Sequence, residues 1–518
     1  MDHVIGVDIG TQSTKALLVR QDGIIVCQHS RSYAPDTPRP NWAEQWPQVW
    51  LDAVEACIAG CVASAVELNN GTPLGPDHIK AVCISSLYGG SGIPVDADMK
   101  PLHPCLIWMD RRAEPQVDWV RTHIDLERLH AITGNGVDSY YGYTKILWLR
   151  DNRPDLWEKT HLFLPPNAFV AYALTGKVAV DHSSAGNIGG LYDVDRRAWS
   201  AEMLDALGIP QKMMPKRLVA STDTVGGLLP QWATRLGLPE GTPIIAGGVD
   251  AAIATYAAGV VGPGQHVAMI GTSMCWGFIA PTADAAHGLI SMPYVTKAHD
   301  DLYVFGGAST AGASVSWYRE QFCQAEVAEG RASGRDPHAL LEERAQHVAA
   351  GSEGVVFLPY LMGERSPVWD GQASGAFVGL NLFHTRAHLY RAVLEGVTFA
   401  LRHNMEAGGR GAVSLEQRLI VVGGAAFSDL WMQIIADVTG YPVFTIRENV
   451  EAPLGAARLA ALGIGLIDRN SPDKWITLDP RATPDAERKR GYDAVFAVYK
   501  DLYPALKASM HRLGELRG

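Results

Sequence analysis

Residues 4–19 read VIGVDIGTQSTKALLV, and this stretch shows how the chain begins to fold. Apolar residues run up to Asp8 and resume after Lys15, while the segment between them is rich in Gly, Ser and Thr. This pattern predicts a β-hairpin with a polar tip. Glycine lets the backbone come close to an anion, and amide and hydroxyl groups donate hydrogen bonds to it. The tip is therefore a candidate phosphate loop, although an ordinary turn has the same composition.

A second segment of the same kind lies in the second half of the chain, where residues 267–279 read VAMIGTSMCWGFI. Two such hairpins predict a duplicated architecture, with a boundary near residues 247–259. Helical patterns such as 46–67 and 145–152 alternate with short apolar strands such as 81–85 and 243–246. This alternation predicts an α/β fold.

Length and composition exclude several classes of protein. The chain has 518 residues, more than one core usually holds, so we expect at least two domains. Apolar residues make up 47% and charged residues 19%, which excludes a disordered chain. The net charge of −11 would repel a polyphosphate backbone, and no basic run offsets it, so nucleic acid is not an expected partner.

No targeting segment is expected. The longest apolar stretches, such as 242–262, are interrupted by Asp250 and several glycines, and the N-terminus leads directly into a strand pattern. We therefore expect neither a signal peptide nor a membrane span. Seven cysteines are scattered, and the closest pair, Cys57 and Cys61, lacks Cys-x-x-Cys spacing. Free thiols in a cytoplasmic protein are the expectation.

Two aspartates end apolar strands and are candidates for phosphoryl-transfer chemistry. Neither a Walker motif nor a Gly-x-Gly-x-x-Gly fingerprint is present, so the hairpin tips would have to bind phosphate. Asp8 lies in the first tip, where it would hold Mg²⁺ or only stabilise the turn. Asp250 precedes a helical run, where it would act as a general base or only as an N-cap.

Further polar groups follow other strands. Gly423, Gly424 and Ala425 end the strand pattern 419–422, before a helical pattern at 430–439, and would admit an adenine or ribose or serve helix packing. Trp108, Asp110, Arg111 and Arg112 follow the strand pattern 105–107 and would bind a sugar or form structural salt bridges. Residues 324–354 predict a solvated helix and 484–516 a terminal amphipathic helix, neither with chemistry of its own.

Two longer motifs resemble the signatures of the FGGY carbohydrate kinases. The second signature is complete, as GAFVGL at 375–380, His388-Leu389 and AVLE at 392–395, preceded by LPYLMGERSP at 358–367. The first appears as KILWL at 145–149, with Gly142 where the family usually has Pro, Ser or Thr. The chain is therefore identified as similar to this family over nearly its whole length, and the xylulokinases are the members it resembles most.

The resemblance implies an α/β fold of two actin-like, ribonuclease-H-like domains around a central cleft, with residues 1–250 mainly binding sugar and 251–518 mainly binding ATP. It implies an ATP- and Mg²⁺-dependent kinase of a small-molecule sugar, with a homodimer as the family's expected assembly. Asp250 resembles the general base and Asp8 the carboxylate near the metal. The first phosphate loop would comprise Gln12, Ser13 and Lys15, the second Gly271 and Thr272, and the other nucleotide contacts Gly312, Gly424, Ala425 and Ser428.

The acceptor region departs from the xylulokinases. Their sugar loop usually reads Gln-Met-His-Gly, whereas residues 86–91 read SLYGGS here, so the expected sugar contacts are Tyr88, Gly89 and Gly90 with Trp108, Asp110, Arg112 and Asp250. The residue after the base, commonly Asn or Gln, is Ala251. A ketose such as D-xylulose remains the first expectation, with a polyol such as erythritol or an aldonate such as gluconate as alternatives. Two alternatives lie outside this class. One is an actin-like ATP-dependent switch. The other is a glycosidase that uses Asp250 and Asp110, although nothing in their spacing along the chain supports it.

Overall fold

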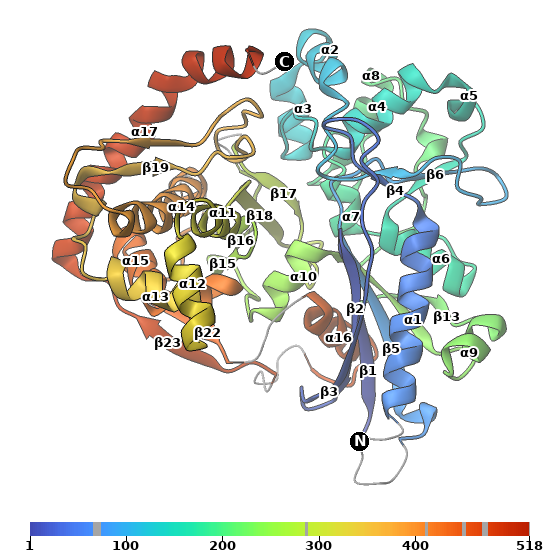
Figure 1. Cartoon of the computed structure of the whole chain (residues 1–518). Coiled ribbons are helices and arrows are strands. Elements are labelled where there is room, and N and C mark those ends of the chain that lie inside the picture. Colours follow the sequence, from blue (N-terminus) through green and yellow to red (C-terminus); the bar gives the residue numbers. More distant parts are fainter. Residues whose placement is uncertain (66–73, 285–287, 410–412, 448–451, 469–474, 517–518) are drawn as a thin grey trace. The chain divides into compact units, whose positions relative to one another are not determined.

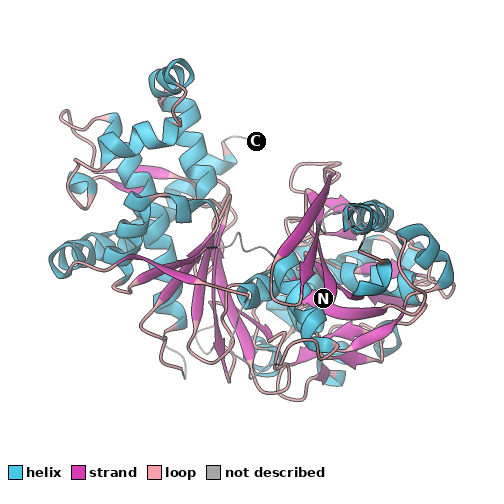
Figure 2. Ribbon diagram, turned by 90° about the horizontal axis from the view of Figure 1, so that it is seen from below, coloured by secondary structure: helices cyan, strands magenta, loops and turns pink. Residues whose placement is uncertain are grey.

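The computed structural model describes residues 1–65, 74–284, 288–409, 413–447, 452–468 and 475–516 (Figure 1). Contacts within the chain define two compact units. The first comprises Met1–Gly262, Ile279–Val304 and Glu448–Thr477, and the second Pro263–Phe278, Phe305–Arg447 and Leu478–Gly518. Figure 2 shows strands gathered into sheets with helices packed against them. The predicted α/β class is confirmed.

Six strands form the main sheet of the first unit, with the bounds β1 (His3–Ile9), β2 (Ser13–Arg20), β3 (Ile25–Ser32), β5 (Ile79–Ser86), β13 (Thr224–Gly227) and β14 (Pro243–Val249). Their order across the sheet is β13-β14-β5-β1-β2-β3. β1 and β2 form the predicted hairpin, in which Asp8 is opposite Lys15. β1, β5 and β14 run parallel, so their carboxyl ends meet at one edge of the sheet.

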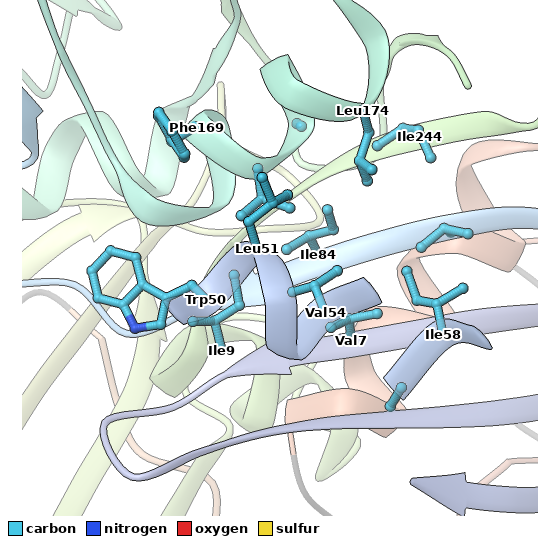
Figure 3. Close-up of a cluster of buried hydrophobic side chains, with 14 of the residues drawn as sticks. Val7, Ile9, Trp50, Leu51, Val54, Ile58, Ile84, Phe169, Leu174 and Ile244 are labelled. Atoms are coloured by element: carbon cyan, nitrogen blue, oxygen red, sulfur yellow. The ribbon is translucent and has the colours of Figure 1, made fainter. Parts of the chain in front are cut away.

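Helices cover both faces of this sheet. Along β1 the odd residues, such as Val7, pack against α1 (Pro47–Ala65) in the buried core that Figure 3 shows. Gly6 points the other way, because side chains alternate along a strand. An ideal Cβ on Gly6 would lie 2.0 Å from the carbonyl oxygen of Pro453 in α16 (Ala452–Gly463), so only glycine permits this close approach.

Helix α1 is the one described helix whose length and composition would allow it to cross a membrane. Nine of its residues are buried, among them Trp50, Val54 and Ile58, which contact the apolar side of the sheet (Figure 3). A core helix has the same composition as a membrane span, and burial against the sheet accounts for the apolar character of α1. The expected helix at 46–67 is confirmed through Ala65, and residues 66 and 67 lie outside the described part.

The second sheet repeats the pattern of the first. Its strands include, in order, β18 (Leu302–Ala308), β16 (Met274–Ala280), β15 (His266–Ile270), β21 (Leu419–Val422), β22 (Val443–Ile446) and β23 (Leu478–Ala482). β15 and β16 pair antiparallel, β15, β21 and β22 run parallel, and β23 is antiparallel to β22. The first sheet has the same sequence of pairings, so the predicted duplication and the second hairpin are confirmed.

Most predicted elements exist with small changes of boundary. The helix expected at 145–152 is α4 (Gly142–Asn152), that at 430–439 is α15 (Asp429–Thr439), and the terminal helix is α17 (Ala486–Glu515). The prediction of a helix over 324–354 is wrong, because this segment contains two helices. It is divided into α12 (Gln324–Ser333) and α13 (Pro337–Ala345), because Gly334 adopts a φ of 70° that ends α12.

Candidate active site

Side chains from distant segments fix the tip of the first hairpin. Trp108 Nε1 donates to Thr11 Oγ1 at 3.0 Å, and Gln45 Nε2 donates to the Thr11 carbonyl oxygen at 3.0 Å. The Tyr33 hydroxyl donates to the Gly10 carbonyl oxygen at 2.7 Å. These contacts hold the loop in one conformation and leave its tip open, since Gln12 is exposed. A loop held in one conformation suits a phosphate group better than a mobile turn does.

Asp8 and Asp250 lie at the carboxyl edge of the first sheet. Asp8 accepts a hydrogen bond from Ser85 Oγ at 2.8 Å and is partly buried. Asp250 is the first residue of α10 (Asp250–Ala257), so the helix N-cap is Val249 rather than Asp250. Burial and the negative charge of Asp8 raise the pKa of Asp250 to about 7. A carboxyl group whose pKa is near 7 is suited to accept a proton.

A buried polar network orients the backbone just before Asp250. Ser183 Oγ accepts from the Val249 amide at 3.1 Å and donates to Asp181 Oδ1 at 2.5 Å. Asn167 Nδ2 donates to Asp181 Oδ2 at 2.9 Å and to the Ala246 carbonyl oxygen at 3.2 Å. The network therefore connects β14 to α7 (His182–Asn187) and fixes where α10 begins.

We expect Asp250→Asn to stabilise the metal-free protein, and more so at pH 8 than at pH 5. The pKa of Asp250 rises from 3.8 to about 7 on folding, so its unfavourable contribution is absent below about 3.8 and complete above about 7. Melting temperatures of both proteins in chelator between pH 4 and 8 measure this difference. A constant gain across that range would show that the charge of Asp250 is not destabilising.

The predicted sugar contacts Tyr88, Gly89 and Gly90 follow β5 directly and are buried. Lys145, in α4, is fully buried and donates from Nζ to the carbonyl oxygens of Gly89 at 2.6 Å and Tyr140 at 2.7 Å. Burial lowers the pKa of this lysine to about 7. Lys145, known from sequence only as part of a signature, therefore fixes the segment that would contact the sugar.

Asp110 and Arg112 form a buried ionic network. Asp110 is fully buried and accepts from the Ala43 amide at 2.6 Å and from Arg112 Nε at 2.9 Å. Arg112 also donates to Glu44 Oε2 at 2.6 Å, and its guanidinium lies 3.8 Å from the ring centroid of Trp42. Both charges are therefore neutralised within the protein, which favours the structural alternative for this pair.

The second unit contains a cavity of about 890 Å³ beside the tip of the second hairpin. Of the nine residues expected to bind ATP, six line this cavity: Gly271, Thr272, Gly312, Gly424, Ala425 and Ser428. Gln12, Ser13 and Lys15, at the tip of the first hairpin, do not line it. Gly312 begins α11 (Gly312–Phe322), and its amide donates to the Gly271 carbonyl oxygen at 2.8 Å. The hairpin tip therefore meets a helix N-terminus, which is a favourable place for phosphate.

Close backbone packing explains Gly423, the first residue after β21. Gly423 has a φ of 91°, and an ideal Cβ on it would lie 2.6 Å from the Ile270 carbonyl oxygen. A side chain there would collide with β15. Ser428 is the N-cap of α15, where its Oγ accepts from the Trp431 amide at 3.0 Å. The packing of Gly423 on β15 and the capping of α15 by Ser428 thus position the residues of this side of the cavity.

The sequence did not reveal several other residues that line this cavity. Segment 324–354 was expected to carry no chemistry, yet α13 contributes His338 and Glu342, and α11 contributes Trp317. Burial raises the pKa of Glu342. No sequence motif marks these positions. Phe427 and Trp431 complete the aromatic part of the lining.

No group of three or more metal-ligating side chains occurs in the part of the chain that the structure describes. Mg²⁺ is usually bound by one or two carboxylates together with substrate phosphates, so such a group is not required. Asp8 fits this role, because a cation beside it would offset the negative charge that, together with burial, raises the pKa of Asp250.

These features are compatible with phosphoryl transfer, and comparison with known families shows that the chain is an ATP-dependent sugar kinase. Residues 3–257 match the N-terminal domain, and residues 266–464 the C-terminal domain, of the FGGY family of carbohydrate kinases. The chain belongs to this family and is a phosphotransferase. The predicted actin-like fold is confirmed, because solved FGGY kinases share the architecture of this chain.

Relatives with two different acceptors are similar to this chain. A xylulose kinase of Lactococcus lactis subsp. lactis (strain IL1403) is 30% identical over 99% of each chain. A gluconokinase of Bacillus licheniformis is 28% identical over 98% of this chain and 96% of its own. The structure of xylulose kinase from Rhodospirillum rubrum has a TM-score of 0.87 at 28% identity, covering 98% of this chain and 100% of its own. Gluconate kinase from Lactobacillus acidophilus has a TM-score of 0.88 at 25% identity, covering 99% of each chain.

Proposed function

We propose that this kinase phosphorylates a neutral acceptor, either a ketose such as D-xylulose or a polyol such as erythritol. The observation that carries this proposal is that the arginines near the predicted sugar-binding residues 88–90 are already paired with carboxylates. Arg112 is paired with Asp110 and Glu44, and Arg111 is paired with Asp138. A cation binds the carboxylate of an aldonate best, and the buried guanidinium of Arg112 is already held by two carboxylates, while Arg111 shares its charge with Asp138.

In the proposed mechanism the carboxylate of Asp250 accepts the proton of the attacking acceptor hydroxyl. The network through Ser183 and Asp181 fixes the Val249 amide next to Asp250, and burial keeps the pKa of Asp250 raised and thus its basicity high. Mg²⁺, bound by Asp8 with the nucleotide phosphates, would offset the negative charge of the transferring group. Asp110 and Arg112, predicted to touch the sugar, are assigned instead to fixing the position of the strand end that carries Trp108.

ATP is assigned to the cavity of the second unit, with its phosphates at Gly271 and Thr272. Gln12, Ser13 and Lys15 at the first tip are assigned to the transferred phosphate. We also propose that residues 1–250 mainly bind the sugar and that residues 251–518 mainly bind ATP. A cytoplasmic location is also proposed, supported by the seven cysteines, which are all described and all free. A homodimer stays a prediction.

ADP release with Mg²⁺ and ATP, measured for ketoses, polyols, aldoses and aldonates at equal concentrations, tests the proposal. We expect the best neutral acceptor to exceed every aldonate in kcat/KM by at least about tenfold, since a hydrogen bond to a charged group is worth about 1.5–3 kcal/mol. An aldonate as the best acceptor would favour the gluconokinase-like alternative. ADP release that no acceptor stimulates would instead favour the ATP-dependent switch.

A further inference from the structure

Three cysteines lie where the last strand of the first sheet packs on α1. β3 follows β2 at the edge of this sheet, and Cys27 on β3 is half-buried, so small solutes can reach its thiol. Cys57 and Cys61 are one helical turn apart on α1, and both are buried. The proposed phosphoryl transfer uses none of these thiols.

β3 and α1 approach each other closely beside Cys61. An ideal Cβ on Gly60 would lie 2.6 Å from Nδ1 of His29 in β3, so glycine is needed at this contact. His29 Nε2 also forms a hydrogen bond with Ser64 Oγ at 2.8 Å. Cys27 Sγ donates to the carbonyl oxygen of Cys61 at 3.6 Å. The Cys27 thiol therefore lies against the residue that carries the Cys61 thiol.

Strand register places Cys57 further from Cys27. Cys57 Sγ donates to the Thr14 carbonyl oxygen at 3.4 Å, and Thr14 is opposite Arg31 in the pairing of β2 with β3. Arg31 is four residues beyond Cys27, which corresponds to about 13 Å along a strand. Cys61 lies one turn further along α1, where it contacts Cys27. It is therefore the thiol of α1 that Cys27 can reach.

The two neighbouring thiols differ in acidity. A hydrogen bond from the Cys61 thiol lowers the pKa of Cys27. The same hydrogen bond, together with burial, raises the pKa of Cys61. At Cys57, burial raises the pKa to about 11. The thiolate is the nucleophilic form of cysteine, so Cys27 combines access to solvent with reactivity, and Cys61 stays protonated beside it.

We propose that Cys27 and Cys61 form a reversible disulfide when a peroxide oxidises Cys27. The Cys27 thiolate attacks one oxygen of hydrogen peroxide, the O–O bond breaks, and the other oxygen leaves as water, with a sulfenic acid on Cys27. Cys61 Sγ then attacks the Cys27 sulfur, the S–O bond breaks, and hydroxide takes the Cys61 proton and leaves as water. Two thiols thus lose two electrons, and one peroxide becomes two water molecules.

This site is separate from phosphoryl transfer and needs no sugar or nucleotide. A disulfide in a cytoplasmic protein is usually transient and redox-sensing, and exchange with a dithiol reverses it. The bond would join residues 34 positions apart and tie the edge strand of the first sheet to α1.

The test treats the native full-length protein with one equivalent of hydrogen peroxide, removes the excess with catalase and counts thiols after unfolding. We expect the wild type to lose two of its seven thiols and to regain both in dithiothreitol. Cys27→Ser should lose none, and Cys57→Ser, the matched control on the same face of α1, should still lose two. Cys61→Ser should lose one, which a sulfenic-acid trap such as dimedone labels.

Mass spectrometry of tryptic peptides identifies the partner. Residues 21–31 should be joined to the peptide that contains both Cys57 and Cys61, and the joined species should persist in Cys57→Ser. Its loss in Cys57→Ser, an equal loss of thiols in Cys27→Ser, or no loss in the wild type would overturn the proposal. Should Cys61→Ser not fold, Cys27→Ser decides, since Cys27 is only half-buried. These readouts use no acceptor, so they are independent of the proposed function.

Discussion

Asp250→Asn is expected to lower kcat by about 10²–10⁴-fold, the usual contribution of a general base. The Ala251 amide donates a hydrogen bond to Asp250 Oδ1 at 2.7 Å. Asparagine has the same shape and keeps an oxygen that can accept this bond, so α10 should begin as before. Only the capacity to accept a proton is lost. Steady-state turnover with the best acceptor measures the effect, and KM for ATP should remain near the wild-type value.

Asp125→Asn is the matched control, because Asp125 is an aspartate at a helix start without a role in the site. It is the N-cap of α3 (Leu126–Thr133) and accepts from the Arg128 amide at 3.0 Å. Asparagine caps helices about as well as aspartate, so kcat should not change. If Asp250→Asn keeps wild-type kcat as well, Asp250 only stabilises the helix start and another group accepts the proton.

Gly312→Ala is expected to weaken nucleotide binding strongly. An ideal Cβ at this position would lie 2.6 Å from the Gly271 carbonyl oxygen, in the tip that lines the cavity. Because the obstacle is backbone, the tip itself must move, at a cost of about 1–3 kcal/mol. This corresponds to a rise of roughly 5- to 150-fold in the Kd for ADP, which calorimetric titration measures.

Gly491→Ala separates this effect from a general consequence of adding a methyl group. Gly491 lies in α17, and an ideal Cβ there meets no atom within 4 Å. Alanine favours a helix by about 1 kcal/mol over glycine, so this variant should melt at a higher temperature and bind ADP as the wild type does. An unchanged Kd for ADP in Gly312→Ala would mean that the cavity beside the second tip does not bind the nucleotide.

Local pattern was sufficient for the elements that carry the chemistry. Residues adjacent in sequence define each of these elements, which are the hairpins at 4–19 and 267–279, the strand before Asp250 and the glycines at 423 and 424. Apolar alternation and turn residues act over a few positions, so a single sequence reveals them. The same limitation explains the error at 324–354, where composition alone concealed the break at Gly334.

The sequence by itself determined the α/β class, the duplicated hairpins, the kinase family and the candidate base Asp250. Only the tertiary structure decided that Asp110 and Arg112 neutralise each other and that α13 lines the cavity beside the second hairpin. It also decided that α16, far along the chain, packs on Gly6. Pairing, burial and close approach are properties of contacts between distant segments, and a local pattern does not contain them.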